Sequence, residues 1–178
     1  MKDVMIDIET LGTEPGSLIL SIGAVRFGPD GVAFERFYRV LDRIDQEDRN
    51  FLVDQETVTW WKTQPEPIAR VLEHGRMPGM FTPGDGALVQ LAHFVEGVER
   101  VWAKPAHFDL VLLHGAYRKY GLTTPWQHRQ AACFRTALKL YGDPGIAADE
   151  ASKHDALADA EYQARQAVAL FNARGWPS

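Results

Sequence analysis

Two acidic residues, Asp7 and Glu9, are separated by a single residue within the apolar segment Val4-Met5-Ile6-Asp7-Ile8-Glu9-Thr10. The β-branched and apolar neighbours predict a buried strand over residues 4–10. Because side chains alternate along a strand, the two carboxylates are expected to point to the same face. Partly desolvated carboxylates repel each other, and a divalent cation is the partner that best offsets this cost. The pair predicts metal binding, with a strand end that reaches solvent as the alternative.

A third acid, Asp109, follows Phe108 just after a predicted short strand. The apolar pattern that begins here predicts a helix, so Asp109 is expected in its first turn. An acidic residue at this place also has a simple structural explanation, because it favours the positive end of the helix dipole. Asp109 gains functional meaning only together with the other acids.

A histidine and a fourth acid, His154 and Asp159, begin the last predicted helix. Ser152 and Asp155 have the spacing of a capping box, which places His154 in the first helical turn. The positive end of the helix dipole would keep its imidazole neutral, as a general base requires. Five residues correspond to about 140° on a helix, so His154 and Asp159 cannot stack on one face. His154 is therefore expected to reach the site from the helix tip or from a loop.

Three strands begin the set of elements that must position these residues. Residues 4–10, 18–27 and 32–41 have strand-like patterns separated by turn-forming segments, which predicts an antiparallel meander. Further on, short strands at 101–103 and 131–134 alternate with helical patterns. These helical patterns lie at residues 88–98, 108–120, 135–141 and 153–174. An antiparallel start followed by βα units predicts an α/β fold with a mixed sheet and flanking helices.

The segment between the meander and the helix at 88–98 is less regular. Residues 42–50 are polar, and Asp54 is suited to cap a short helix that carries Trp60 and Trp61. Neighbouring residues on a helix point about 100° apart, so one ring is expected in the core and the other at the surface. A second short helix is expected to end near residue 75, before a Gly- and Pro-rich loop over residues 76–86.

The acidic segments together resemble the motifs of the DEDDh, or DnaQ-like, 3′→5′ exonucleases of the RNase H-like superfamily. The residues that match the three motifs are Asp7 and Glu9, Phe108 and Asp109, and His154 and Asp159. The chain is most similar to the small stand-alone exoribonuclease and phage exonuclease A-like branch, because it has the Trp60-Trp61 pair and the segment Phe134-Arg135-Thr136. Lys104 and Pro105 stand where relatives often carry Asn and Gly.

The resemblance implies an RNase H-like fold with a mixed five-stranded sheet and hydrolysis of single-stranded 3′ ends to nucleoside 5′-monophosphates. Two divalent cations, Mg²⁺ or Mn²⁺, would be held by the four acids, and His154 would act as general base. The metal ligands implied are Asp7, Glu9, Asp109 and Asp159. The substrate contacts expected are Thr10, Leu11, Trp61, Phe108 and Arg135.

Length, charge and cysteine content are consistent with this class. At 178 residues the chain is expected to form a single exonuclease domain, residues 1–178. Its single cysteine, Cys133, excludes an internal disulfide framework, and no segment has the apolar length of a signal peptide or membrane span. A cytoplasmic protein is expected. The net charge of −5 argues against an extended grip on duplex DNA, but not against a metal-loaded groove.

Several alternatives remain open at this level. RNA is slightly favoured over DNA as substrate by the branch resemblance, but no residue can be tied to a 2′-hydroxyl contact. A catalytically silent nucleic-acid-binding module is the alternative of another class. A nucleotide-binding oxidoreductase is excluded because no Gly-x-Gly-x-x-Gly follows the first strand. The branch also suggests a homodimer, with residues 42–87 as the segment that forms contacts or a substrate lid.

Overall fold

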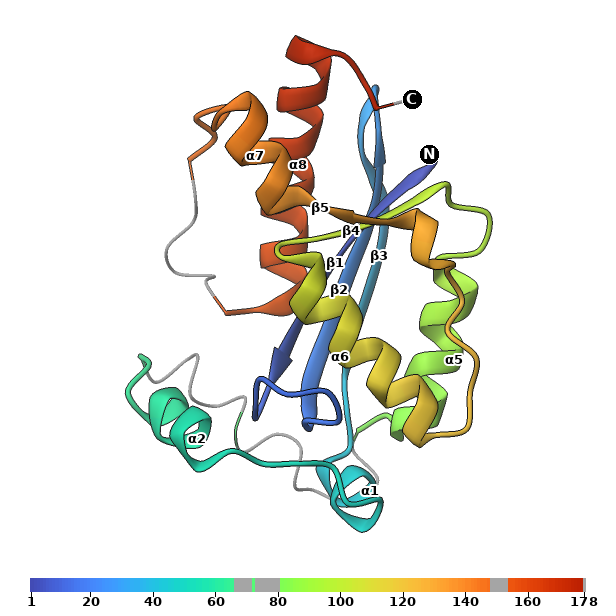
Figure 1. The fold of residues 1–178 in the computed structure, drawn as a ribbon, viewed down its shortest axis with the longest axis vertical. Coiled ribbons are helices and arrows are strands. Elements are labelled where there is room, and N and C mark those ends of the chain that lie inside the picture. The colour runs from blue at the N-terminus through green and yellow to red at the C-terminus, as the bar shows by residue number, and fades with distance from the viewer. Residues whose placement is uncertain (66–71, 73–80, 148–153, 178) are drawn as a thin grey trace.

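The sheet at the centre of the fold has five strands in the order β3-β2-β1-β4-β5 (Figure 1). This computed structural model describes residues 1–65, 72, 81–147 and 154–177. The strands are β1 (Asp3–Thr10), β2 (Ile19–Gly28), β3 (Gly31–Val40), β4 (Arg100–Ala103) and β5 (Ala131–Cys133). The first three pair antiparallel, whereas β4 runs parallel to β1 and β5 parallel to β4. The meander and the mixed five-stranded sheet predicted from the sequence are confirmed.

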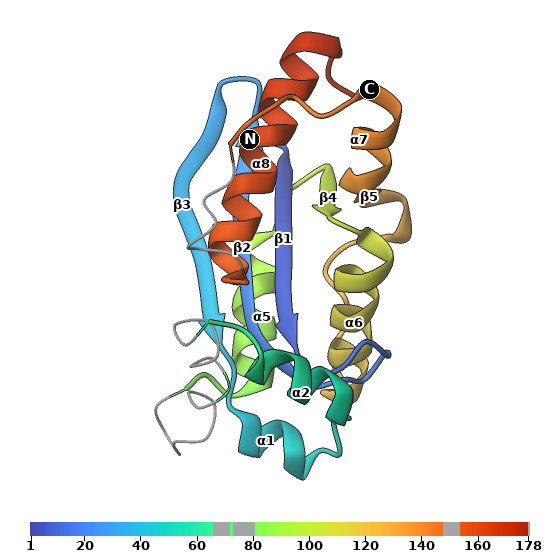
Figure 2. The same cartoon turned by 90° about the vertical axis from the view of Figure 1, so that its left-hand side faces the viewer.

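Helices cover both faces of the sheet (Figures 1 and 2). One face carries α5 (Gly84–Phe94) and α6 (Ala106–Lys119), and the other carries α7 (Phe134–Tyr141) and α8 (Ala156–Arg174). Two short helices, α1 (Arg43–Asp48) and α2 (Gln55–Lys62), lie beyond the end of the sheet at which β1 stops. A single turn of 3₁₀ helix, His128–Gln130, precedes β5. Within the described part of the chain, none of the helices is long and apolar enough to cross a membrane.

The alternation of side chains along β1 separates two hydrophobic cores. Val4, Ile6 and Ile8 belong to the core beneath α5 and α6. Met5 belongs to the second core, which α7 and α8 cover. Asp7 has the same parity as Met5, so its side chain points toward α8, as alternation requires. The strand therefore places its acids on the α8 face of the sheet.

Gly23 allows α8 to lie unusually close to the sheet. It is the residue of β2 that pairs with Asp7 of β1. A Cβ atom at this position would lie 2.2 Å from the carbonyl carbon and oxygen of Ala156, in the first turn of α8. Backbone atoms cannot move aside as a flexible side chain can, so only glycine is compatible with this packing. The absence of a side chain thus brings the start of α8 against the acid-bearing strand.

The helices before β4 differ from the sequence predictions in two places. The polar stretch 42–50 contains α1, whose buried Gln46 pairs with both backbone groups of Ile19. The helix predicted at 88–98 begins earlier, at Gly84, and ends at Phe94. Its first turn is fixed by Asp45 of α1, which accepts a hydrogen bond from the Gly84 N–H. Both differences arise from contacts between segments, which periodicity along one segment cannot reveal.

The remaining boundaries agree with the sequence predictions to within a few residues. Asp54 caps α2, as predicted, by accepting hydrogen bonds from the backbone N–H groups of Glu56 and Thr57. The short helix expected to end near residue 75 lies almost entirely outside the described residues. Of the loop expected at 76–86, residues 76–80 also lie outside the described residues, whereas its last three residues belong to α5 and not to a loop.

Candidate active site

Asp7 and Glu9 lie at the end of β1, on the face that α8 covers. Asp7 is partly buried, and Glu9 is 8% exposed. The Nε2 group of Gln163, on α8, donates a hydrogen bond of 2.8 Å to Oδ1 of Asp7. The strand geometry thus places both carboxylates on one face of the sheet, as the sequence predicted. Gln163 of α8 fixes the position of the Asp7 carboxylate.

Asp109 approaches the same strand from the first turn of α6. Its Oδ1 accepts a hydrogen bond of 3.2 Å from the backbone N–H of Ile8. This N–H is available because β4 pairs with β1 only as far as Met5. The other oxygen, Oδ2, is buried and finds no hydrogen-bond partner among the described residues. An unpartnered buried carboxylate oxygen is costly, which makes it a strong candidate for a cation ligand.

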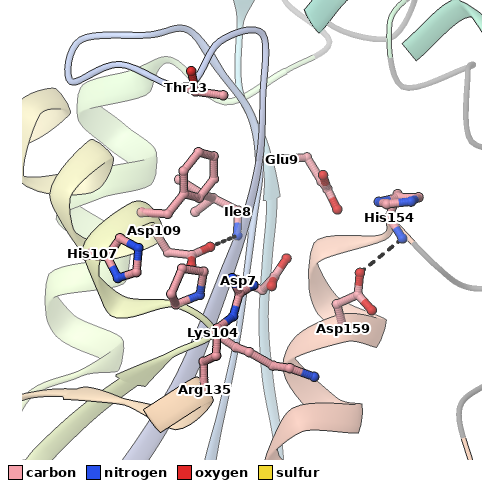
Figure 3. Close-up of a pocket in the computed structure, with 12 residues that line it drawn as sticks. Asp7, Ile8, Glu9, Thr13, Lys104, His107, Asp109, Arg135, His154 and Asp159 are labelled. Atoms are coloured by element: carbon pink, nitrogen blue, oxygen red, sulfur yellow. Dashed lines mark hydrogen bonds between the residues drawn. The ribbon is translucent and has the colours of Figure 1, made fainter. Parts of the chain in front are cut away.

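His154 and Asp159 complete the group from the start of α8 (Figure 3). The predicted capping box is wrong, because the residue that caps the helix is Asp155, which accepts a hydrogen bond from the Ala158 N–H. His154 therefore precedes the helix instead of lying in its first turn, and has a positive φ of 62°. Its backbone N–H donates to Oδ2 of Asp159 at 3.0 Å. His154 thus reaches the site from the turn just before α8, which agrees with the expected approach from the helix tip or a loop.

The geometry of this group suits a divalent cation. One ligand atom from each of Glu9, His154 and Asp159 lies within 4.8 Å of the others. Asp7 is linked to the same group electrostatically, through the charges of Asp109, Glu9 and Asp159. Carboxylate oxygens are the ligands that Mg²⁺ and Mn²⁺ prefer.

Burial and mutual repulsion raise the pKa of every acid in the group. Burial, reinforced by the neighbouring carboxylates, holds the pKa of Asp7 well above its usual range. Burial and the charges of Asp159 and Asp109 raise the pKa of Glu9 to about 8. Burial raises the pKa of Asp109 to about 7, and it also raises that of Asp159. Carboxylates in such a place retain protons near neutral pH unless a cation offsets their repulsion.

A pocket of about 560 Å³ opens over the acids, and Phe108 and Arg135 line it, as expected of substrate contacts. Two other expected contacts are far more buried, and of these Leu11 needs correction. Trp61 is only 1% exposed, and its indole N–H donates to the carbonyl of Thr10 at 2.8 Å. Leu11 is fully buried. Leu11 therefore offers no side-chain surface to a ligand, whereas Trp61 supports the end of β1 and still lines the adjoining pocket.

Trp60 is the tryptophan that faces the pocket side. It is 42% exposed, and its ring centre lies 5.0 Å from that of His154 in an edge-on arrangement. Thr10, which was also expected to contact substrate, lines an adjoining pocket together with Trp60. One buried and one exposed tryptophan is the division that helical geometry predicted, but the sequence did not show which ring was which.

Sequence reasoning missed Gln163 and assigned no role to Lys104 or Thr13, both of which line the pocket. Gln163 is four residues after Asp159, so both side chains lie on the same face of α8. This spacing was the available signal for Gln163. In the sequence, Lys104 stood out only as a departure from the motif of the relatives. Its position beside the acids arises because it directly follows the short strand β4.

The family model of the 3′-5′ exoribonuclease Rv2179c-like domain matches residues 2–171. The chain belongs to this family. No curated protein matches the sequence of this exoribonuclease domain. The DEDDh resemblance and the exonuclease class that the three acidic motifs predicted are therefore confirmed.

Two solved structures share the fold. One is the nuclease domain of 3′hExo, a DEDDh family member, bound to rAMP, with a TM-score of 0.68 and 12% identity over 97% of this chain and 92% of that one. The other is exonuclease X in complex with 5′ overhanging duplex DNA, with a TM-score of 0.60 and 16% identity over 98% of this chain and 94% of that one. At these identities the likeness establishes the RNase H-like DEDDh fold.

Proposed function

We propose that this domain is a metal-dependent 3′→5′ exonuclease that removes nucleoside 5′-monophosphates from single-stranded RNA. The observation that carries the proposal is the convergence of four carboxylates and one histidine, from β1, α6 and the start of α8, in one open pocket. The description of the family supports RNA as the substrate. Single-stranded DNA is the second candidate, since one structural relative is bound to DNA.

The acids have the roles of cation ligands in this proposal. Asp7, Glu9, Asp109 and Asp159 would hold two divalent cations, Mg²⁺ or Mn²⁺, and the unpartnered Oδ2 of Asp109 fits such a role. When bound, the cations would acidify a water molecule and offset charge on the phosphate and on the leaving oxygen. The raised pKa values of the acids imply that the metal-free site is partly protonated, so cation binding and proton release are coupled.

His154 is proposed as the general base that accepts the proton of the attacking water. Its ring is next to Glu9 and Asp159, on the open side of the pocket. The hydrogen bond from its backbone N–H to Asp159 fixes the turn that presents the ring. Within the described part of the chain, the imidazole nitrogens form no hydrogen bond, so they are suited to take a proton from a water molecule in the pocket.

The test of the proposed activity uses single-stranded RNA and DNA of one sequence, labelled at the 5′ end, with Mg²⁺, Mn²⁺ or EDTA. Stepwise shortening that requires metal and releases nucleoside 5′-monophosphates is the expected result, with RNA shortened faster than DNA. Tight binding without shortening would contradict the proposal and favour a silent binding module. Faster shortening of DNA would contradict the RNA assignment alone.

The test of the base compares two substitutions in the same assay. We expect His154→Ala to lower turnover by about 10²–10⁴-fold while Mn²⁺ binding, measured by calorimetry, persists. Asp7→Asn should abolish both turnover and metal binding. A His154→Ala protein that keeps full activity, or one that loses Mn²⁺ affinity as Asp7→Asn does, would show that His154 is not the base.

A further inference from the structure

The pocket over the acids is one part of a longer groove. An adjoining pocket of about 460 Å³ shares Ile8, Glu9, Thr13 and Phe108 with it, so the two are continuous. Along β1 the order of residues is Asp7, Glu9 and Thr10, and Thr10 lines only the second pocket. The acids thus lie in the middle of a groove that has two chemically different ends.

The end beyond Thr10 is aromatic and acidic. The half-exposed ring of Trp60 lines this end together with Phe108. Two exposed carboxylates of the α2 region, Asp54 and Glu56, also line this end. None of the described residues that line it is Lys or Arg. This composition suits the flat ring of a base but repels a phosphate group.

The other end, next to Asp7 and Asp109, is cationic. Lys104 and Arg135 line it, and Figure 3 shows them below Asp7, on the side away from Glu9 and Thr13. Within the described part of the chain, neither residue forms a salt bridge, although the Lys104 ammonium lies 5.8 Å from the ring centre of Tyr162. Lys104 and Arg135 act on Asp159 and Asp109 only through space, so each charge can also interact with an anionic ligand in the groove.

The position of Arg135 is unfavourable for α7 itself, although its charge also favours the ionised form of Asp109. Arg135 is the second residue of this helix and is exposed. The helix dipole favours acidic residues in a first turn and disfavours cations, and this turn contains no acidic residue. A cation at this place is thus unfavourable for the helix but lies where the groove needs positive charge to hold phosphate.

A strand that loses its 3′-terminal nucleotide has a matching asymmetry of charge. On one side of the scissile phosphate is a nucleoside with no further phosphate. On the other side every nucleotide adds one negative charge. We propose that Lys104 and Arg135 bind the phosphate on the 5′ side of the scissile bond, while the terminal nucleoside lies in the end lined by Trp60. The inference rests on the proposed function. It adds the direction in which the RNA strand lies in the groove and the residues that bind its upstream phosphate.

The experiment compares two RNA dinucleotides that differ in one group. A 5′-hydroxyl dinucleotide contains only the scissile phosphate, whereas its 5′-phosphorylated form also carries the upstream phosphate. We expect the protein to prefer the phosphorylated form in kcat/KM, and each of Lys104→Ala and Arg135→Ala to reduce this preference by about fivefold or more. Lys104→Arg and Arg135→Lys keep the charge and should keep most of the preference.

Lys139→Ala is the matched control, because Lys139 is an exposed cation of α7 that does not line the groove. It should leave the preference unchanged. Equal rates on the two dinucleotides, or substitutions at Lys104 and Arg135 that lower both rates by the same factor, would overturn the inference. Hydrolysis of neither dinucleotide, and of no longer RNA, would instead overturn the proposed function on which it rests.

Discussion

The free energy of unfolding of the metal-free protein should fall as the pH rises through the neutral range. In the folded protein, burial and neighbouring carboxylates raise the pKa of Glu9 to about 8, from the 4.5 of a free glutamate side chain. Between these two values the folded state holds a proton that the unfolded chain has released. The folded state therefore binds more protons, and linkage requires stability to decrease with increasing pH.

The size of this effect follows from Glu9 alone. One proton of difference corresponds to about 1.4 kcal/mol per pH unit, so raising the pH from 5.5 to 7.5 should cost about 2–3 kcal/mol. For a chain of this length, each kcal/mol shifts Tm by about 2–4 °C. The metal-free protein should thus melt about 5–10 °C lower at pH 7.5 than at pH 5.5 as a result of this one group.

Thermal denaturation in EDTA, and again with Mg²⁺, measures the effect. Mg²⁺ should stabilise the protein more at pH 7.5 than at pH 5.5, because the ionised carboxylates then have a cationic partner. Glu9→Gln removes one of the titrating groups and should make the metal-free profile shallower, whereas Glu35→Gln, at an exposed residue of β3, should leave it unchanged. If Glu9→Gln and the unmodified protein lose Tm equally with pH, or Mg²⁺ stabilises equally at both pH values, the reasoning is refuted.

Three further outcomes are expected. Gln163→Leu removes the donor to Asp7 and should raise the Mg²⁺ concentration needed for half-maximal activity about tenfold. Gln163→His, which can also donate to Asp7, should need less Mg²⁺ than Gln163→Leu. An unchanged Mg²⁺ requirement in Gln163→Leu would contradict the role of Gln163 in positioning Asp7. Trp60→Ala should raise KM for RNA by about tenfold and Trp60→Phe by less, measured by steady-state kinetics, and equal effects would argue against stacking. Gly23→Ala should lower Tm by several degrees, since its Cβ meets the backbone of α8; an unchanged melting curve would contradict that packing.

Local pattern was sufficient to predict the elements that hold the acids. Alternation along β1 placed Asp7 and Glu9 on one face, and the parity of Met5 confirms that face as the one covered by α8. The three motifs were predicted to meet, and the structure brings them together in one pocket. These predictions succeeded because they depend on strand and helix periods and on motif order, which are visible along the sequence.

Features that depend on contacts between segments could not be predicted in this way. The start of α5 is fixed by Asp45, a residue of another helix. Which tryptophan is buried depends on how α2 docks against Thr10, where the Trp61 indole donates its hydrogen bond. The position of His154 depended on a choice between two capping residues, and Asp155 caps where a box with Ser152 was expected. Sequence spacing allowed both arrangements, and only packing selects between them.

The hydrogen bonds that hold the acids have a consequence for how the protein folds. Ile8 and Asp109 are separated by 101 residues, and Asp7 and Gln163 by 156. Contacts of such long range carry a large loop-closure entropy and are made only after the intervening chain is organised. The meander can form from neighbouring segments, but cation affinity cannot appear until α8 has docked on β1. In a refolding experiment, the recovery of metal binding should therefore follow the slowest phase, and a nascent chain that ends before Asp159 would lack the assembled site.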